Sequence, residues 1–159
     1  KGHLMGGFGG ALKNISIGIG SSRGKLWIHS AGKSTNQAEV WSNLPEQDDF
    51  LESMADASRG VIDYMGKENM LYISIANNLS VDCDCDANPH APEMDDLGIF
   101  ASTDPVALDQ ACYDAVINAE DSGKAALIER MNSRHGIHTV EAANKLGLGN
   151  REYEIVNID

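Results

Sequence analysis

The sequence has few basic residues, few cysteines and no long apolar run, and each shortage excludes a class of protein. Only 12 Lys and Arg stand against 24 Asp and Glu, so the formal net charge is −12. Such a field repels nucleic acid and anionic membrane surfaces, and we expect neither as a partner. No apolar run approaches the roughly 18 residues of a membrane-spanning helix. The 3 cysteines do not form a disulfide framework, so reduced thiols in the cytoplasm are expected.

The length and the order of apolar patterns predict one α/β domain. A chain of 159 residues has the size of a single domain. Segments with strand character alternate with segments of helical periodicity, which favours a central sheet, mostly parallel or mixed, covered by helices. The expected strands are residues 25–30, 70–76, 98–101 and 153–158, with 70–76 as a buried strand. The expected helices are residues 48–64, 105–118, 123–132 and 139–146.

The start of the chain is rich in glycine and invites comparison with phosphate-binding loops. Residues 6–14 read G-G-F-G-G-A-L-K-N. The dinucleotide-binding fingerprint G-x-G-x-x-G fails here, because Leu12 stands where the third glycine belongs. Two interpretations stay open: close packing of the backbone, or a loop whose N–H groups hold an anion or cofactor. In the second interpretation Gly9 and Gly10 are candidate cofactor-binding residues.

The sharpest chemical signal is D-C-D-C-D at residues 82–86. In an extended chain both thiols would lie on one side and the carboxylates on the other. A metal ion deprotonates the thiols that coordinate it, and two thiolates are half of a tetrahedral site. The remaining ligands could come from His3, His29 and His90. The alternatives are a calcium loop, which Ala87 disfavours where glycine is needed, and a structural loop whose acids cap backbone N–H groups.

Several other reactive residues have structural interpretations. Cys112 lies within the apolar face of a predicted helix and is expected to be a small core residue. Asp104 is expected to cap the same helix, and Asp109 to face solvent from it. For His135 and His138, capping or surface placement is favoured over metal ligation, because Gly136 separates them at a helix start.

Five segments in order carry a resemblance to a known family. They are K-G-H-L-M-G-G-F-G-G-A-L-K-N, G-K-L-W-I-H-S, V-D-C-D-C-D-A-N-P-H-A-P-E-M-D-D-L-G-I-F-A-S, D-P-V-A-L-D-Q-A and E-A-A-N-K-L-G-L-G-N-R-E-Y-E. The chain resembles the domain of unknown function 362 family over nearly its whole length, except about residues 31–60 and 118–135. The resemblance implies an iron–sulfur-associated protein and suggests that residues 1–159 are the C-terminal part of a longer chain. Many members carry ferredoxin-like cysteine segments, whereas residues 31–49 here contain no cysteine.

The residues and the resemblance together predict a redox-associated or metal-dependent enzyme domain. Cys83 and Cys85, helped by His3 or His29, are expected to hold iron or zinc or to bridge an iron–sulfur cluster. A small-molecule substrate or a cofactor would face Lys13 and Asn14. The alternative is a non-catalytic binding module that has lost its relatives' clusters and docks a redox protein partner.

Overall fold

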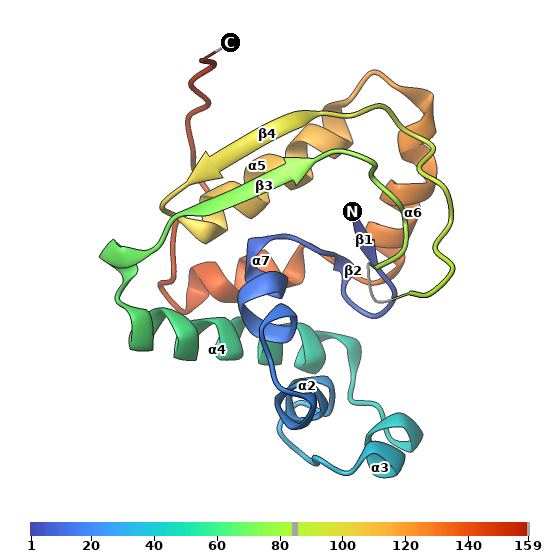
Figure 1. The fold of residues 1–159 in the computed structure, drawn as a ribbon, viewed down its shortest axis with the longest axis vertical. Coiled ribbons are helices and arrows are strands. Elements are labelled where there is room, and N and C mark those ends of the chain that lie inside the picture. Colours follow the sequence, from blue (N-terminus) through green and yellow to red (C-terminus); the bar gives the residue numbers. More distant parts are fainter. Residues whose placement is uncertain (84–85, 159) are drawn as a thin grey trace.

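The computed structural model describes residues 1–83 and 86–158, which form a mixed helix and sheet arrangement (Figure 1). Two short strands and two short helical segments come first, before the larger helices and the second strand pair. The elements are β1 (Gly2–His3), β2 (Gly7–Phe8), α1 (Ala11–Lys13), the π-helix η1 (Asn14–Gly18), α2 (Ser22–His29), α3 (Gln37–Ser42), α4 (Gln47–Met65), η2 (Lys67–Asn69), β3 (Tyr72–Ala76), β4 (Gly98–Ser102), α5 (Pro105–Asn118), η3 (Ser122–Lys124), α6 (Ala125–Ser133) and α7 (His138–Lys145).

The long helix α4 forms where apolar periodicity and capping signals agree. Acidic side chains in its first turn complement the helix dipole, and Gly66, with φ 82°, ends it. Its buried face consists of Phe50, Leu51, Met54, Ala55, Ser58 and Ile62. The predicted helix at residues 48–64 is therefore confirmed.

In the part of the chain that the structure describes, no helix is long and apolar enough to cross a membrane.

Helix α5 also begins and ends where the sequence predicts it. The side chain of Asp104 accepts hydrogen bonds from Val106 N at 2.9 Å and Ala107 N at 3.0 Å, and Pro105 occupies the first helical position. An aspartate cap followed by proline is pre-organised for a helix start. The predictions for residues 123–132 and 139–146 are confirmed by α6 and α7, with boundaries shifted by a few residues.

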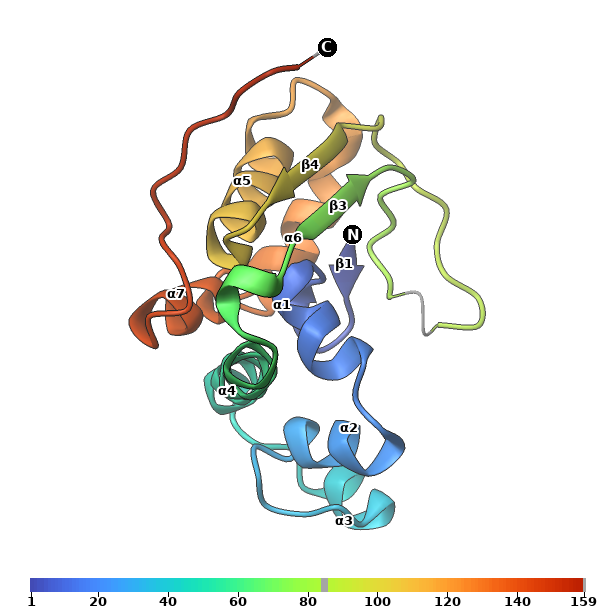
Figure 2. The ribbon, with the colours of Figure 1, turned by 60° about the vertical axis from the view of Figure 1, so that its left-hand side comes forward.

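The central sheet is the part of the fold prediction that the structure corrects. The chain is an α/β protein, but its described residues form only two antiparallel pairs, β1 with β2 and β3 with β4. The strand predicted at residues 25–30 is wrong, because Ser21 accepts a hydrogen bond from Gly24 N at 3.1 Å and starts helix α2 there. The strand predicted at residues 153–158 is also wrong. That segment forms neither helix nor strand and leads away from the body of the molecule (Figure 2).

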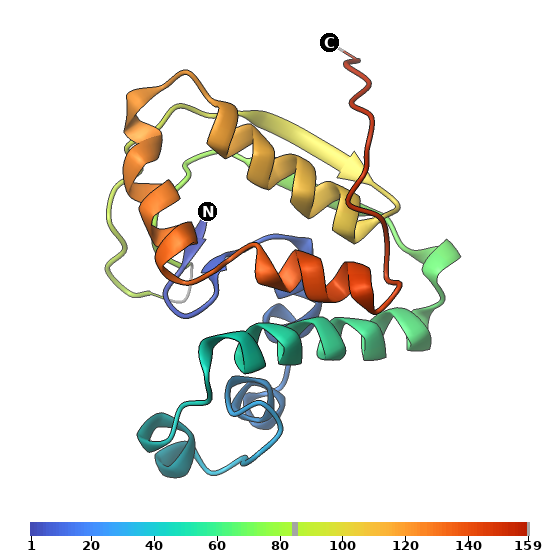
Figure 3. The same ribbon diagram turned by 180° about the vertical axis from the view of Figure 1, so that it is seen from behind.

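The β3–β4 pair packs one face on α5 and leaves the other uncovered (Figures 1 and 3). Tyr72 and Ala76 are buried, whereas Ile73, Ile75 and Ile99 are 59%, 67% and 71% exposed. The strand at 70–76 exists, but the prediction that it is buried is wrong, since no second layer covers its outer face. Apolar side chains alone do not distinguish a covered face from an open one.

Two hydrophobic clusters lie on either side of α4. The larger one joins α1, α4, α5, α6 and α7 beneath the β3–β4 pair. The smaller one fills the space between α4, η1 and α2, and consists of Ile17, Ile28, Phe50, Leu51 and Met54. Figure 2 shows α2 and α3 beyond α4, on the side away from the β3–β4 pair. The glycine-rich start of the chain leads into α1, which contacts α5 beneath the β3–β4 pair, and into η1, which contacts α4 and α2.

Candidate functional site

The glycine-rich loop does hold an anion, but this anion is a side chain of the protein itself. The N–H groups of Ala11 and Leu12 donate to Asp109 Oδ1 at 2.6 Å and to Oδ2 at 2.9 Å. Asp109 comes from α5 and is only 1% exposed, so the prediction that it faces solvent is wrong. A Cβ atom on Gly10 would overlap this carboxylate, which explains the glycine there. The first turn of α1 is thus capped from across the core.

Burial dominates the ionisation of Asp109. Desolvation raises the pKa of its carboxyl to about 6, and the N–H groups of Leu12 and Ala11 oppose that rise. Cys112 lies one turn further along α5 and is buried, as predicted for a core residue. Burial, and then the negative charge of Asp109, raise the pKa of the Cys112 thiol to about 11, so this thiol stays protonated at neutral pH.

A cavity of about 530 Å³ lies between the glycine-rich loop and strand β3. All four candidate cofactor-binding residues line it together: Gly9, Gly10, Lys13 and Asn14. The opposite wall is formed by residues 70–79, which include β3, with Cys112 and Val116 of α5. Backbone polar groups, an ammonium and an amide therefore face a partly apolar wall, which is the usual composition of a small-molecule pocket.

Lys13 connects this cavity to the cysteine loop. Its Nζ donates a hydrogen bond to Cys83 Sγ at 3.7 Å, although 70 positions separate the two residues in sequence. Cys83 is 2% exposed, so its sulfur is shielded from solvent. Cys85, the second cysteine of the predicted metal site, lies outside the described residues.

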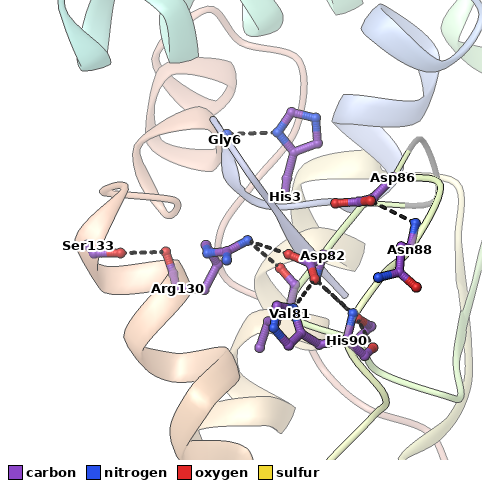
Figure 4. Close-up of polar contacts among 10 residues, drawn as sticks. His3, Gly6, Val81, Asp82, Asp86, Asn88, His90, Arg130 and Ser133 are labelled. Atoms are coloured by element: carbon purple, nitrogen blue, oxygen red, sulfur yellow. Dashed lines mark hydrogen bonds and ion pairs between the residues drawn. The ribbon is translucent and has the colours of Figure 1, made fainter.

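His3 is close to this region but is unsuited to bind a metal in its present hydrogen-bonding state. Its Nδ1 accepts the N–H of Gly6 at 2.8 Å (Figure 4), so in the neutral ring the proton is assigned to Nε2. Burial first, and then the charge of Lys13, lower the pKa of His3 to about 3. With one nitrogen engaged as an acceptor and the other protonated, neither nitrogen of His3 offers a free lone pair to a metal ion.

His29 has the opposite arrangement. Its Nδ1 donates to the carbonyl of Lys25 at 2.6 Å, which leaves the lone pair of Nε2 available as a ligand. The ring stacks on Phe50 with centroids 5.2 Å apart and meets Trp41 edge-on at 5.4 Å. Burial lowers the pKa of His29, although the hydrogen bond to Lys25 opposes this. The chemistry of His29 therefore fits a neutral metal ligand.

The structure does not gather the described members of the predicted metal site around one point. Among residues 1–83 and 86–158, the one group of three or more His, Cys, Asp or Glu residues with ligand atoms within 4.8 Å of one another is Asp48, His135 and His138. His3, His29 and Cys83 therefore do not form such a group by themselves. A site that also uses Cys85 stays a prediction.

Asp82 holds the start of the cysteine loop in place. Its carboxylate is buried and accepts hydrogen bonds from Arg130 Nη1 at 3.1 Å and from His90 N at 2.9 Å (Figure 4). His90 Nδ1 lies 2.6 Å from the same carboxylate, so this nitrogen of His90 is engaged by Asp82. Asp82 thus caps a backbone N–H group, which is the structural role that the sequence offers as an alternative for the acids of this motif.

The contacts of the Asp82 carboxylate with His90 and Arg130 predict that the stability of the fold falls in acid. The hydrogen bonds from His90, the backbone N–H first, lower the pKa of Asp82 to about 2, against an ordinary value of 3.8. A lowered folded-state pKa contributes stability that is present above about pH 4 and is lost as the pH falls toward 2. We expect Asp82→Asn to remove this part of the pH dependence, measured by urea unfolding between pH 2.5 and 5. Equal slopes in the parent and variant would contradict this role; Asp86→Asn is the control.

The fold and the site define a small α/β protein with a cavity between a glycine-rich loop and an edge strand, next to a buried cysteine. The chain belongs to the family described as Domain of unknown function (DUF362), which it matches over residues 1–114. The prediction from the sequence motifs is thus confirmed, although the last motif lies beyond the matched residues. No curated protein and no solved structure matches the chain.

Proposed function

We propose that this chain is a redox-associated or metal-dependent enzyme domain, in which Cys83 and Cys85 hold a metal ion or bridge an iron–sulfur cluster beside the cavity. The observation that carries the proposal is the hydrogen bond from Lys13 Nζ to Cys83 Sγ at 3.7 Å. Because Lys13 also lines the cavity, one ammonium group connects a small-molecule pocket with a shielded sulfur. A substrate bound in the cavity would then lie near the metal that the two cysteines hold.

The donor groups fit iron or zinc only in part. Thiolate sulfur and the free Nε2 of His29 suit either metal, whereas His3 does not fit, because Gly6 already uses its lone pair. A bound metal or cluster would supply electron transfer or Lewis-acid chemistry. The protein supplies positioning: the Lys13 ammonium offsets negative charge on sulfur or substrate, and Asn14 offers amide hydrogen bonds inside the cavity.

We expect anaerobically purified protein to contain iron or zinc, and the Cys83→Ser variant to lose it. The test is elemental analysis together with an absorption spectrum, since iron–sulfur clusters absorb visible light and zinc does not. Cys112→Ala is the matched control, because Cys112 is also a buried cysteine but packs in α5 and should leave the metal content unchanged. Equal metal content in the parent and in the Cys83→Ser variant would exclude this site.

The second candidate function is a non-catalytic binding module that docks a redox protein partner. It is favoured by the outer face of the β3–β4 pair, where Leu71, Ile73, Ile75 and Ile99 are exposed next to one another. Contiguous exposed apolar side chains of this kind mark interaction surfaces. The same elemental analysis separates the two functions, because a docking module needs no metal at Cys83.

A further inference from the structure

A second cluster, of two histidines and one aspartate, lies where the turn between α6 and α7 meets the first turn of α4. Figure 3 shows the backbone of these two segments. His135 stands in that turn and His138 begins α7, while Asp48 lies in the first turn of α4. The three residues come together across a sequence separation of 87 positions. Their placement therefore depends on the packing of α4 against α7 and is not visible in the sequence.

The geometry of this cluster is close to that of a metal site. His135 Nδ1 lies 2.8 Å from Asp48 Oδ1, and one ligand atom from each of the three residues lies within 4.8 Å of the others. The two imidazole rings stack with centroids 4.9 Å apart and planes inclined by 24°. With bonds of about 2.0–2.1 Å, the ligand atoms of a tetrahedral zinc ion stand about 3.3 Å apart. The His135 and Asp48 side chains are about half exposed, at 50% and 52%, so they have room to adjust toward that spacing.

Two further carboxylates surround His138. Glu52 Oε1 lies 3.2 Å from its Nε2, and Glu141 Oε2 lies 3.6 Å from its Nδ1. Whichever nitrogen binds a metal, a carboxylate can therefore accept a hydrogen bond from the other, as in most histidine metal sites. His135 takes φ 50°, a conformation that residues other than glycine rarely adopt, and this conformation belongs to the turn that stacks its ring on His138.

We propose that Asp48, His135 and His138 form a binding site for a divalent transition-metal ion, separate from the cysteine loop. Two imidazole nitrogens and one carboxylate oxygen suit zinc, and also ferrous iron or nickel, better than calcium or magnesium, which prefer oxygen ligands alone. Three protein ligands leave a coordination position for water or for Glu52. Because the ligands come from both sides of the contact between α4 and the α6–α7 turn, the ion would hold these elements together.

The test measures zinc binding by the full chain at neutral pH after chelator treatment. Isothermal titration calorimetry gives the affinity and the number of sites, and thermal unfolding gives the effect on stability. We expect one equivalent of zinc to bind at this site, besides any zinc that the cysteine loop takes up, and to raise the melting temperature. The variants are His135→Asn, because asparagine tolerates the left-handed conformation, and Asp48→Asn. Each should weaken binding by more than about 100-fold, since partners outside the coordination shell alone account for 10–100-fold.

The controls separate this site from the cysteine loop. Cys83→Ser and His90→Gln should retain the zinc equivalent that His135→Asn loses, whatever happens to metal at the cysteines. Loss of a different equivalent in Cys83→Ser would concern the proposed function and leave this inference intact. If His135→Asn and Asp48→Asn bind zinc with the affinity of the parent, or if the parent binds none, the site does not exist.

Discussion

Asp109→Ala is expected to lower the free energy of unfolding at pH 7 by about 2–6 kcal/mol, because it leaves two buried N–H groups without an acceptor. The Asp109 carboxylate accepts hydrogen bonds from Ala11 N and Leu12 N, and Asp109 is only 1% exposed. Water therefore cannot replace the carboxylate without entering the core. The measurement is urea unfolding monitored by circular dichroism. Glu120→Ala removes an exposed acid just beyond α5 and should change stability by no more than about 0.5 kcal/mol.

The same substitution has a pH signature with a defined sign. The pKa of Asp109 is raised to about 6 in the folded protein, so the folded state holds more protons than the unfolded state between pH 3.8 and 6. The stability contributed by protonated Asp109 is therefore lost as the pH rises through this range. The free energy of unfolding of the parent exceeds that of Asp109→Ala, and this difference should shrink by about 1 kcal/mol between pH 5 and pH 7. A constant difference would show that Asp109 does not titrate as proposed.

Gly10→Ala is expected to be strongly destabilising, whereas Gly9→Ala is expected to be nearly neutral. A Cβ on Gly10 would overlap the Asp109 carboxylate, and overpacking plus a lost hydrogen bond should cost at least about 2 kcal/mol. A Cβ on Gly9 would lie 3.5 Å from Gly2 O, which is ordinary contact, so its cost should stay within about 0.5 kcal/mol. Neither glycine has positive φ, so backbone strain does not explain the difference.

This pair of variants also separates close packing from ligand binding in the glycine-rich loop. Both glycines line the cavity, but only Gly10 touches the buried carboxylate. Equal losses of stability in the two variants would indicate that the loop is constrained by something other than Asp109. The comparison needs only thermal and urea unfolding, because it concerns the unliganded chain.

Local signals determined which elements could be predicted from the sequence. α4 and α5 were predictable because apolar spacing agrees with acids or an Asp-Pro pair at the start. The strand prediction for residues 25–30 is wrong because it rests on the alternation of Leu26 and Ile28 alone and leaves out the cap at Ser21, which accepts a hydrogen bond from Gly24 N and starts a helix. Residues 153–158 have strand composition, but composition cannot supply the neighbouring strand that pairing needs.

The candidate site depends on contacts that no local pattern encodes. Lys13 and Cys83 were both recognised as candidates, yet their contact spans 70 positions and follows from how the loop packs. The prediction that Asp109 faces solvent is wrong because nothing near it in sequence indicates the two N–H donors 97 and 98 positions away. The sequence favours capping or surface placement over metal ligation for His135 and His138, and Asp48, which completes their cluster, lies on another helix.

The most direct test of the central proposal is metal-edge X-ray absorption on anaerobically purified protein carrying His135→Asn, which removes the ligand cluster on α4 and α7. Thiolate ligation by Cys83 and Cys85 predicts sulfur neighbours at ~2.3 Å from the metal, and these should disappear with Cys83→Ser. Nitrogen and oxygen neighbours alone, at ~2.0–2.1 Å, or protein without bound metal, would contradict a metal or iron–sulfur site at the cysteine loop.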